Sequence, residues 1–304
     1  TIDNSSGTIT VANNYGSMTA TNIAYVGLSG LDDTVMGGSW SEEFFAGGGT
    51  DVITGGAGID QFNEIFSNQT KLTITDYESY ERLQFEDQWW DATSDYNFSL
   101  ADIETQFSIA YSNSSNSTFI SINTSAFNKN NVVELQNGNF ILSYYDIEDN
   151  AKDLSLYLKS NTNPNKNSYS IGADKELFVI KDFVTGDALT LDGAFGFNST
   201  NYADEIWVSY DPVQNRTLID LNTSTITKDN IVVIDGRYAL NSSTYGSSGD
   251  LILSLTTPGT NFASFITKNG ANLQINGAQI PNSWSGRGIY CNGSDTSVTF
   301  NGIK

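Results

Sequence analysis

A strict nine-residue period between Leu28 and Asn63 constrains the fold more than any other feature of this chain. The clearest repeat reads Gly55-Gly56-Ala57-Gly58-Ile59-Asp60-Gln61-Phe62-Asn63, and the preceding nine residues, 46–54, fit it with only the first glycine changed. Glycine permits tight turns with positive φ. Short strands that each bury one apolar side chain are stable only when several coils stack. The pattern therefore predicts a parallel β-roll. Carboxylates recur at Asp33, Glu42, Asp51 and Asp60, and apolar residues recur at Val35, Phe44, Ile53 and Phe62.

The turns of this roll carry oxygen donors. A glycine turn directs backbone carbonyls and the recurring carboxylate toward a common point, and Ca²⁺ takes roughly six to eight oxygen ligands of this kind. The pattern therefore indicates a calcium site, although a roll that is held together by packing alone is the alternative.

These motifs resemble the RTX (hemolysin-type calcium-binding repeat) proteins. The resemblance implies that alternate turns lie on opposite edges of the roll, with each ion between turns that are two repeats apart in the sequence. It pairs Asp33 with Asp51 on one edge and Glu42 with Asp60 on the other, and it implies that carbonyls complete both shells. Trp40 and Glu42 depart from the repeat, so the Asp33/Asp51 edge is expected to be the better site. The implied carbonyl ligands are those of Gly47, Gly49, Gly56 and Gly58.

The rest of the chain is predicted to be all-β. The phrase Lys71–Tyr77 returns at 177–183, and between Phe107 and Val133 each strand-like segment returns 99 residues later. Short alternating strands separated by Asn, Gly, Ser and Asp turns predict two related β-rich modules, solenoid-like or sandwich-like. The expected segments are an N-terminal strand segment (1–27), the roll (28–63), module 1 (64–160), module 2 (161–258) and a C-terminal β segment (259–304).

Composition disfavours several classes of partner. The formal charge is −21, and nucleic acids and anionic membranes both need a basic surface. No apolar stretch reaches the length of a membrane span, so membrane insertion is not expected. Bound divalent cations would relieve the repulsion between so many carboxylates, although the acidity could equally keep a secreted protein soluble. Calcium is abundant outside cells, which predicts an extracellular or cell-surface location. Asn-x-Ser/Thr triplets indicate a possible glycoprotein; they include Asn4, Asn116, Asn123, Asn215, Asn222 and Asn292.

Catalytic groups are scarce. The chain has no histidine, which excludes Ser-His-Asp and Cys-His nucleophiles and His-ligated zinc. The single cysteine, Cys291, has no basic neighbour in the sequence. Carboxylate pairs could in principle hydrolyse glycosides, but so acidic a chain contains such pairs by chance, and no enzyme is predicted. The pairs in question include Asp76, Glu78 and Glu81, and Asp204 with Glu205.

The sequence favours an extracellular calcium-binding structural protein, a self-assembling homo-oligomeric subunit of a surface layer or fibre. An end strand, either Thr8–Val11 or Ser297–Phe300, is expected to add to the sheet of a neighbouring copy. The alternative is the ligand-binding module of a calcium-dependent adhesin that holds glycans or another surface. In that case Trp89 or Trp90 is the best candidate contact residue, because adjacent strand residues face opposite ways.

Overall fold

The computed structural model is 56% strand and 3% helical, and its sheets are arranged as a β-solenoid of about 7 turns, which confirms the predicted all-β class. It divides into two compact units, residues 1–164 and 165–304. Before residue 24 and after residue 257 only the backbone of certain strands is described. The described residues are 2–3, 8–13, 16–21, 24–63, 65, 69–85, 98, 102–124, 128–148, 153–163, 166, 168–200, 202, 205–211, 213–257, 272–276 and 297–301.

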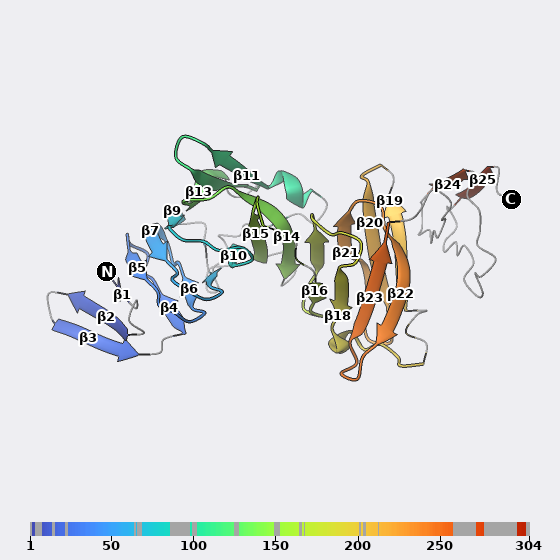
Figure 1. Cartoon of the computed structure of the whole chain (residues 1–304), viewed down its shortest axis with the longest axis horizontal. Helices are drawn as coiled ribbons and strands as arrows, with labels where there is room; N and C mark the ends of the chain where they lie inside the picture. Colours follow the sequence, from blue (N-terminus) through green and yellow to red (C-terminus); the bar gives the residue numbers. More distant parts are fainter. Residues whose placement is uncertain are drawn as a thin grey trace. The chain divides into compact units, whose positions relative to one another are not determined.

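In the first unit, the strands of the roll alternate between two sheets, and they are drawn in blue in Figure 1. Neighbours within each sheet are parallel and stand one coil apart, so that Thr34 pairs with Val52 and Glu43 pairs with Gln61. One sheet contains β5 (Thr34–Met36), β7 (Gly49–Thr54) and β9 (Gln69–Ile74). The other contains β4 (Tyr25–Gly27), β6 (Glu43–Phe45), β8 (Gln61–Asn63) and β10 (Arg82–Phe85).

The recurring apolar residues form the core between these two sheets, as predicted. Val35 is 2% exposed, and Phe44, Ile53 and Phe62 are fully buried. The Phe44 and Phe62 rings stack with their centroids 5.5 Å apart. Because each strand has only three to six residues, the inward side chains of neighbouring coils supply the apolar burial that a single coil lacks.

Module 1 continues both sheets of the roll. Strand β13 pairs in parallel with β9, with Val133 opposite Leu72, and β15 pairs antiparallel with β10, with Leu156 opposite Leu83. The predicted segments 28–63 and 64–160 therefore lie in one unit. Its further elements are the 3₁₀ helix η1 (Ile103–Thr105) and strands β11 (Phe107–Ser112), β12 (Ser117–Asn123), β13 (Asn128–Leu135), β14 (Phe140–Glu148) and β15 (Asp153–Ser160).

An N-terminal hairpin extends the β5 sheet at its other end. Strand β1 (Ile2–Asp3) pairs in parallel with β5, and antiparallel with β2 (Thr8–Asn13), which in turn pairs with β3 (Gly16–Thr21). The predicted strand Thr8–Val11 is confirmed as part of β2. Among the described strands, β3 has β2 as its one neighbour, so the edge of this sheet belongs to β3.

The second unit repeats module 1. Strand β21 pairs in parallel with β17, and β23 pairs antiparallel with β18, as β13 and β15 do with β9 and β10. Its elements are β16 (Ser168–Ile171), β17 (Leu177–Ile180), β18 (Ala188–Leu191), η3 (Gly193–Phe195), β19 (Ile206–Asp211), β20 (Arg216–Asn222), β21 (Thr227–Asp235), β22 (Ala239–Tyr245), β23 (Leu251–Thr256), β24 (Asn272–Asn276) and β25 (Ser297–Asn301).

The repeat of the two modules holds down to single turns. Asn116 and Asn215 both have positive φ, and each accepts a hydrogen bond from the hydroxyl of a tyrosine that precedes it, Tyr111 or Tyr210. The β12–β13 ladder shifts register between Ile120 and Ile122, and the β20–β21 ladder shifts between Ile219 and Leu221. The sequence repeat is therefore a repeat of local structure.

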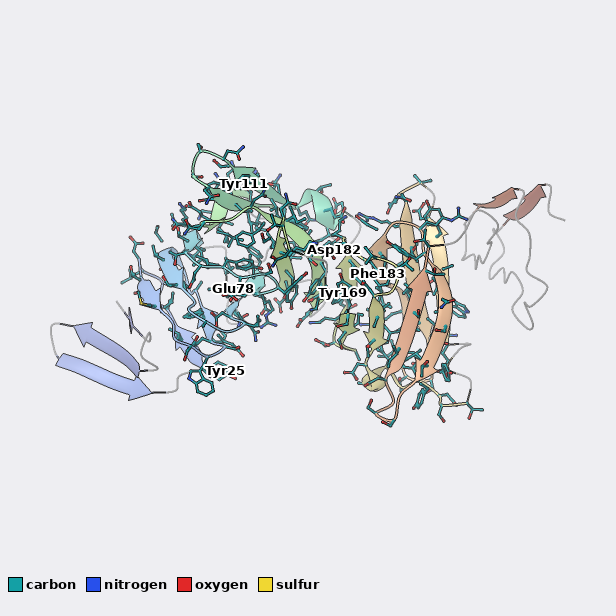
Figure 2. All side chains as sticks on the ribbon, viewed as in Figure 1. Tyr25, Glu78, Tyr111, Tyr169, Asp182 and Phe183 are labelled. Carbon is teal, nitrogen blue, oxygen red and sulfur yellow. The ribbon has the colours of Figure 1, made fainter. Side chains whose placement is uncertain are left out.

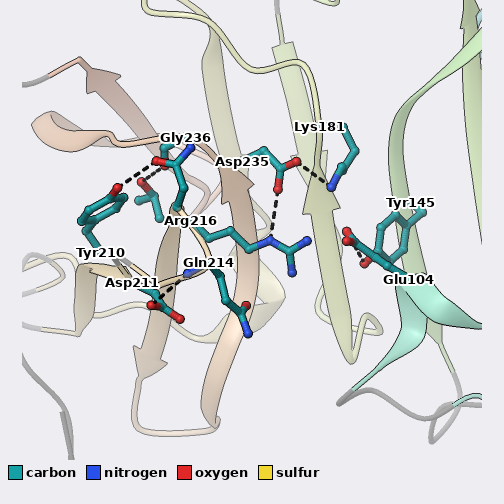
Figure 3. A network of polar contacts seen from close by, with 11 residues as sticks. Glu104, Tyr145, Lys181, Tyr210, Asp211, Gln214, Arg216, Asp235 and Gly236 are labelled. Carbon is teal, nitrogen blue, oxygen red and sulfur yellow. Dashed lines mark hydrogen bonds and ion pairs between the residues drawn. The ribbon is translucent and has the colours of Figure 1, made fainter.

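Charged side chains also bind the strands of the second unit to one another. Figure 3 shows Asp235, at the end of β21, accepting from Lys181 at 2.5 Å and from the Arg216 guanidinium at 3.2 Å. Lys181 directly follows β17 and Arg216 begins β20, so the Asp235 carboxylate links β21 to both of these strands.

Some expectations fall outside the described residues. They concern Trp89, Trp90, Asp204, Cys291, and the triplets at Asn4 and Asn292. The predicted terminal strand Ser297–Phe300 is confirmed as part of β25, which pairs in parallel with β24. Within the described part, no helix is long and apolar enough to cross a membrane.

Candidate metal centre

The recurring carboxylates form two columns, one on each edge of the roll. In one column the Asp33 N–H donates to Asp51 Oδ1 at 2.8 Å. In the other the Glu42 N–H donates to Asp60 Oδ1, also at 2.8 Å. The structure thus brings together the pairs that the RTX resemblance implies. Each of these bonds joins one coil to the next, so the spacing of two repeats per coil fixes both pairs.

The first column, Asp33 and Asp51, is rich in hydrogen-bond donors. The backbone N–H and the hydroxyl of Ser29 both donate to Asp33 Oδ2, at 2.9 and 2.8 Å. Asp51 is fully buried, and its Oδ2 accepts from the Gln69 side-chain amide at 2.8 Å. Burial raises the pKa of Asp51, while the donors from Gln69 and Asp33 lower it.

The second column, Glu42 and Asp60, is fully buried. Glu42 Oε1 accepts from the Gly38 N–H at 3.2 Å, and Asp60 Oδ2 has no donor among the described residues. Burial, followed by the charge of Asp60, raises the pKa of Glu42 to about 7. Burial raises the pKa of Asp60 to about 6, with a further contribution from the charge of Asp76. Two such carboxylates side by side need either a shared proton or a cation.

Glu81 continues the second column in the next coil. Its Oε1 accepts from the Asp60 N–H at 3.1 Å, and its Oε2 accepts from the Glu78 N–H at 2.7 Å. Burial raises the pKa of Glu81 to about 8. Nearby, Asp76 accepts from the Gly55 and Gly56 N–H groups at 2.8 and 2.9 Å. Asp76 and Glu81, which the sequence suggested only as carboxylates paired by chance, therefore accept hydrogen bonds from the backbone of the roll.

The glycines leave room for the backbone of the neighbouring coil. A Cβ on Gly56 would stand 2.0 Å from the Gly38 oxygen, and one on Gly58 would stand 2.5 Å from the Trp40 oxygen. On the opposite edge, the same atom on Gly49 would stand 2.7 Å from the Leu31 oxygen. Their φ angles of 98°, 129° and 92° are also ones that side chains disfavour. Only glycine fits these turns.

The carbonyls that face the glycines come from the preceding coil. The resemblance implies ligands from Gly47, Gly49, Gly56 and Gly58, whereas the oxygens beside those glycines belong to Ser29, Leu31, Gly38 and Trp40. The Gly49 oxygen points toward the following coil, where it accepts from the Gln69 side-chain amide at 2.9 Å. The glycines themselves lie where the resemblance places them, in the turns beside the carboxylate columns.

These residues fit a calcium ion. The fit rests on Asp60 Oδ2, which is buried without a donor among the described residues, and on the backbone carbonyls that the glycine turns bring close to the next coil. In the part of the chain that the structure describes, no three Asp, Glu, Cys or His side chains gather as a metal cluster. Carboxylates come in pairs here, so backbone carbonyls would have to supply the other ligands, which is chemistry that calcium accepts.

Sequence reasoning did not place Gln69 and Glu81 in these columns. Gln69 lies two repeats after Asp51 and could have been found by extending the period. Glu81 lies further from Asp60 than two repeats, because the coils lengthen at this point and Gln61 pairs with Arg82. Comparisons of the chain with protein-family models, curated proteins and solved structures find no match.

Proposed function

We propose that this chain is an extracellular calcium-binding structural protein of the RTX type, a self-assembling subunit of a surface layer or fibre. Calcium would lie between coils of the roll. The observation that carries the proposal is the buried Glu42/Asp60 pair, whose Asp60 Oδ2 has no donor among the described residues.

The residues that would hold the ion come from both coils at an edge. Glu42 and Asp60 would supply carboxylates, Trp40 would supply its carbonyl, and Gly38 would supply the second lone pair of a carbonyl that already accepts from the Ala57 N–H at 2.9 Å. When bound, the ion neutralises two carboxylates that otherwise repel each other in a buried site. The chain itself orients the site, because the Glu42 N–H fixes Asp60 Oδ1 and leaves Oδ2 for the ion. Asp33 and Asp51, with the carbonyls of Ser29 and Leu31, would form the corresponding set on the other edge.

Assembly is supported by the sheet edge at β3. An edge strand presents unpaired N–H and C=O groups that can pair with another chain. Among the described strands of this hairpin, β2 is flanked by β1 and β3, so the strand that could pair with a neighbouring copy here is Gly16–Thr21 rather than Thr8–Val11. The parallel β24–β25 pair offers a second candidate for exchange between copies.

Calcium dependence is tested with the chelated full chain. We expect added CaCl₂ to raise the unfolding temperature measured by circular dichroism, and MgCl₂ to raise it less, because Mg²⁺ demands a tighter octahedral shell. Identical unfolding in CaCl₂ and in excess EGTA would contradict the proposal.

Assembly is tested by electron microscopy of the same samples. We expect ordered polymers in calcium and their loss in EGTA. Deletion of residues 1–21, which removes the hairpin together with its edge strand β3, or of residues 290–304, should leave folded monomers that no longer polymerise. If both truncated chains form intact polymers, strand exchange is not the mode of assembly.

A second function, the ligand-binding module of an adhesin, is favoured by exposed aromatic side chains on the roll. Trp40 is 61% exposed, and Tyr25, which is labelled in Figure 2, is 64% exposed and stacks on Phe45. Aromatic faces of this kind can stack on sugars. Glycan-array binding that vanishes in Trp40→Ala, with unfolding unchanged, would favour this function over a purely structural one.

A further inference from the structure

Gln69 occupies the next place in the Asp33/Asp51 column. Successive members of this column are two repeats apart, so that a glutamine stands where the repeat would supply another carboxylate. Strand β7 shifts register against β9 between Gly49 and Thr50, and this shift sets Gly49 directly opposite Gln69. The side chain is therefore held at the end of the column, where the glycine repeats stop.

The Gln69 amide nitrogen is surrounded by oxygens. Its Nε2 lies 2.8 Å from Asp51 Oδ2, 2.9 Å from the Gly49 oxygen and 3.0 Å from the Lys71 oxygen. One carboxylate and two carbonyls form the kind of donor set that calcium accepts. A glutamine amide has only two hydrogens to share among these three acceptors. Its own Oε1 is buried without a partner among the described residues.

From this geometry we infer that the Gln69 side-chain amide substitutes for a cation and ends the row of metal positions on this edge. The amide then fills the space between Asp51 and residue 69, and no calcium ion binds there. The inference rests on the proposed function, because it assumes that calcium binds between the earlier members of this column, Asp33 and Asp51.

The surroundings of Gln69 supply positive charge from the protein itself. Lys129 Nζ donates to the Gln69 backbone oxygen, and the ammonium group of Lys71 forms an ion pair with Glu134. An Asp or Glu at position 69 would instead place a second carboxylate against Asp51. Glutamine avoids this repulsion at the place where the roll passes into module 1.

The test uses Gln69→Glu in the full chain, because glutamate has the shape of glutamine but replaces the amide NH₂ with a carboxylate oxygen. The matched control is Gln61→Glu, which adds the same charge on strand β8, where the side chain is half-exposed. Calcium bound per chain is measured by atomic absorption after dialysis, and unfolding temperature is measured in EGTA and in CaCl₂.

We expect Gln69→Glu to bind one more calcium ion per chain than the wild type, to unfold at a lower temperature in EGTA, and to recover in CaCl₂. Gln61→Glu should bind the same number of ions as the wild type. The shorter variant Gln69→Asp should also gain an ion and recover in calcium.

Equal ion counts in Gln69→Glu, Gln69→Asp and the wild type, or failure of both variants to fold in calcium, would overturn the inference. The wild type separates this result from the proposed function. Calcium binding by the wild type with no gain in either variant refutes the role of Gln69 alone. A gain in the variants with no calcium in the wild type refutes the proposed function and leaves the amide as a cation substitute.

Discussion

The two edges of the roll follow one nine-residue pattern but satisfy their buried carboxylates differently. On the Asp33/Asp51 edge, the Ser29 hydroxyl donates to Asp33 Oδ2 and the Gln69 amide donates to Asp51 Oδ2. On the Glu42/Asp60 edge, Asp60 Oδ2 is buried with no donor among the described residues. The departures of Trp40 and Glu42 from the repeat suggested that the first edge is the better metal site. The hydrogen bonds favour the second, because there the protein supplies less of the compensation that an ion would give.

The largest effect is expected from the glycines, which both edges need equally. Gly56→Ala places a Cβ against the Gly38 carbonyl at a φ of 98°, and Gly49→Ala meets the Leu31 carbonyl at a φ of 92°. Each should lower the free energy of unfolding by about 3 kcal/mol or more, measured by urea unfolding in calcium.

Gly30→Ala is the matched control for these variants, because a Cβ there has nothing within 4 Å. Its unfolding free energy should stay within about 0.5 kcal/mol of the wild type. A tolerated Gly56→Ala would mean that the coils do not stack as closely as described.

The pH dependence of the chelated protein should follow the second edge. The folded pKa values of Asp60, Glu42 and Glu81 are raised to about 6, 7 and 8. Between unfolded pKa values of about 4 and these folded values, the folded state holds more protons. Stability in EGTA should therefore fall as pH rises from 5 to 8, by up to about 1.4 kcal/mol per pH unit for each titrating group.

Calcium should flatten that pH profile, since the ion replaces the protons. The measurement is urea unfolding at several pH values with EGTA or CaCl₂. A stability in EGTA that rises across the same pH range would show that these carboxylates are not buried together.

Removing one charge from each edge should give opposite results in EGTA. Asp60→Asn removes a buried carboxylate that lacks a donor and should raise the unfolding free energy by about 1 kcal/mol. Asp51→Asn weakens bonds from Asp33 and Gln69 and should lower it by about 1 to 2 kcal/mol.

In calcium, Asp60→Asn should lose part of the stabilisation that the ion gives to the wild type. Chemical unfolding of both variants, with and without EGTA, measures these differences. The comparison between the edges fails if Asp60→Asn and Asp51→Asn are destabilised alike in EGTA.

The smallest effects are expected at the exposed serines. Ser29→Ala removes a donor to Asp33 on the first edge, and Ser41→Ala removes the acceptor of the Ile59 N–H, at 3.0 Å, on the second. Each should cost about 0.5 kcal/mol in urea unfolding, because water can replace an exposed partner. A much larger loss in either would place that serine in the interior of the site.

The nine-residue period was sufficient to predict the strands, their parallel stacking and the core of the roll. Phe44 and Phe62 are buried because an eighth-position apolar residue must face inward when coils stack. The long-range repeat of module 1 likewise predicted a second, related β module, and the second unit repeats the strand pairings of module 1.

The finer chemistry of the columns could not be predicted, because it depends on where the coils change length. Gln61 pairs with Arg82, which lies more than two repeats further along the chain, so the period no longer points to Glu81. The shift between Gly49 and Thr50 brings the Gln69 amide to Asp51, and a repeat of spacing alone does not reveal such a contact. The direction of each carbonyl depends on local φ and ψ, which the residue types leave open in glycine turns.

The most direct test is the anomalous scattering of calcium in crystals of the full chain grown with CaCl₂. We expect an anomalous peak on the second edge, beside Asp60 Oδ2 and within ligand distance of Glu42. An ordered roll in saturating calcium with no peak there would contradict it.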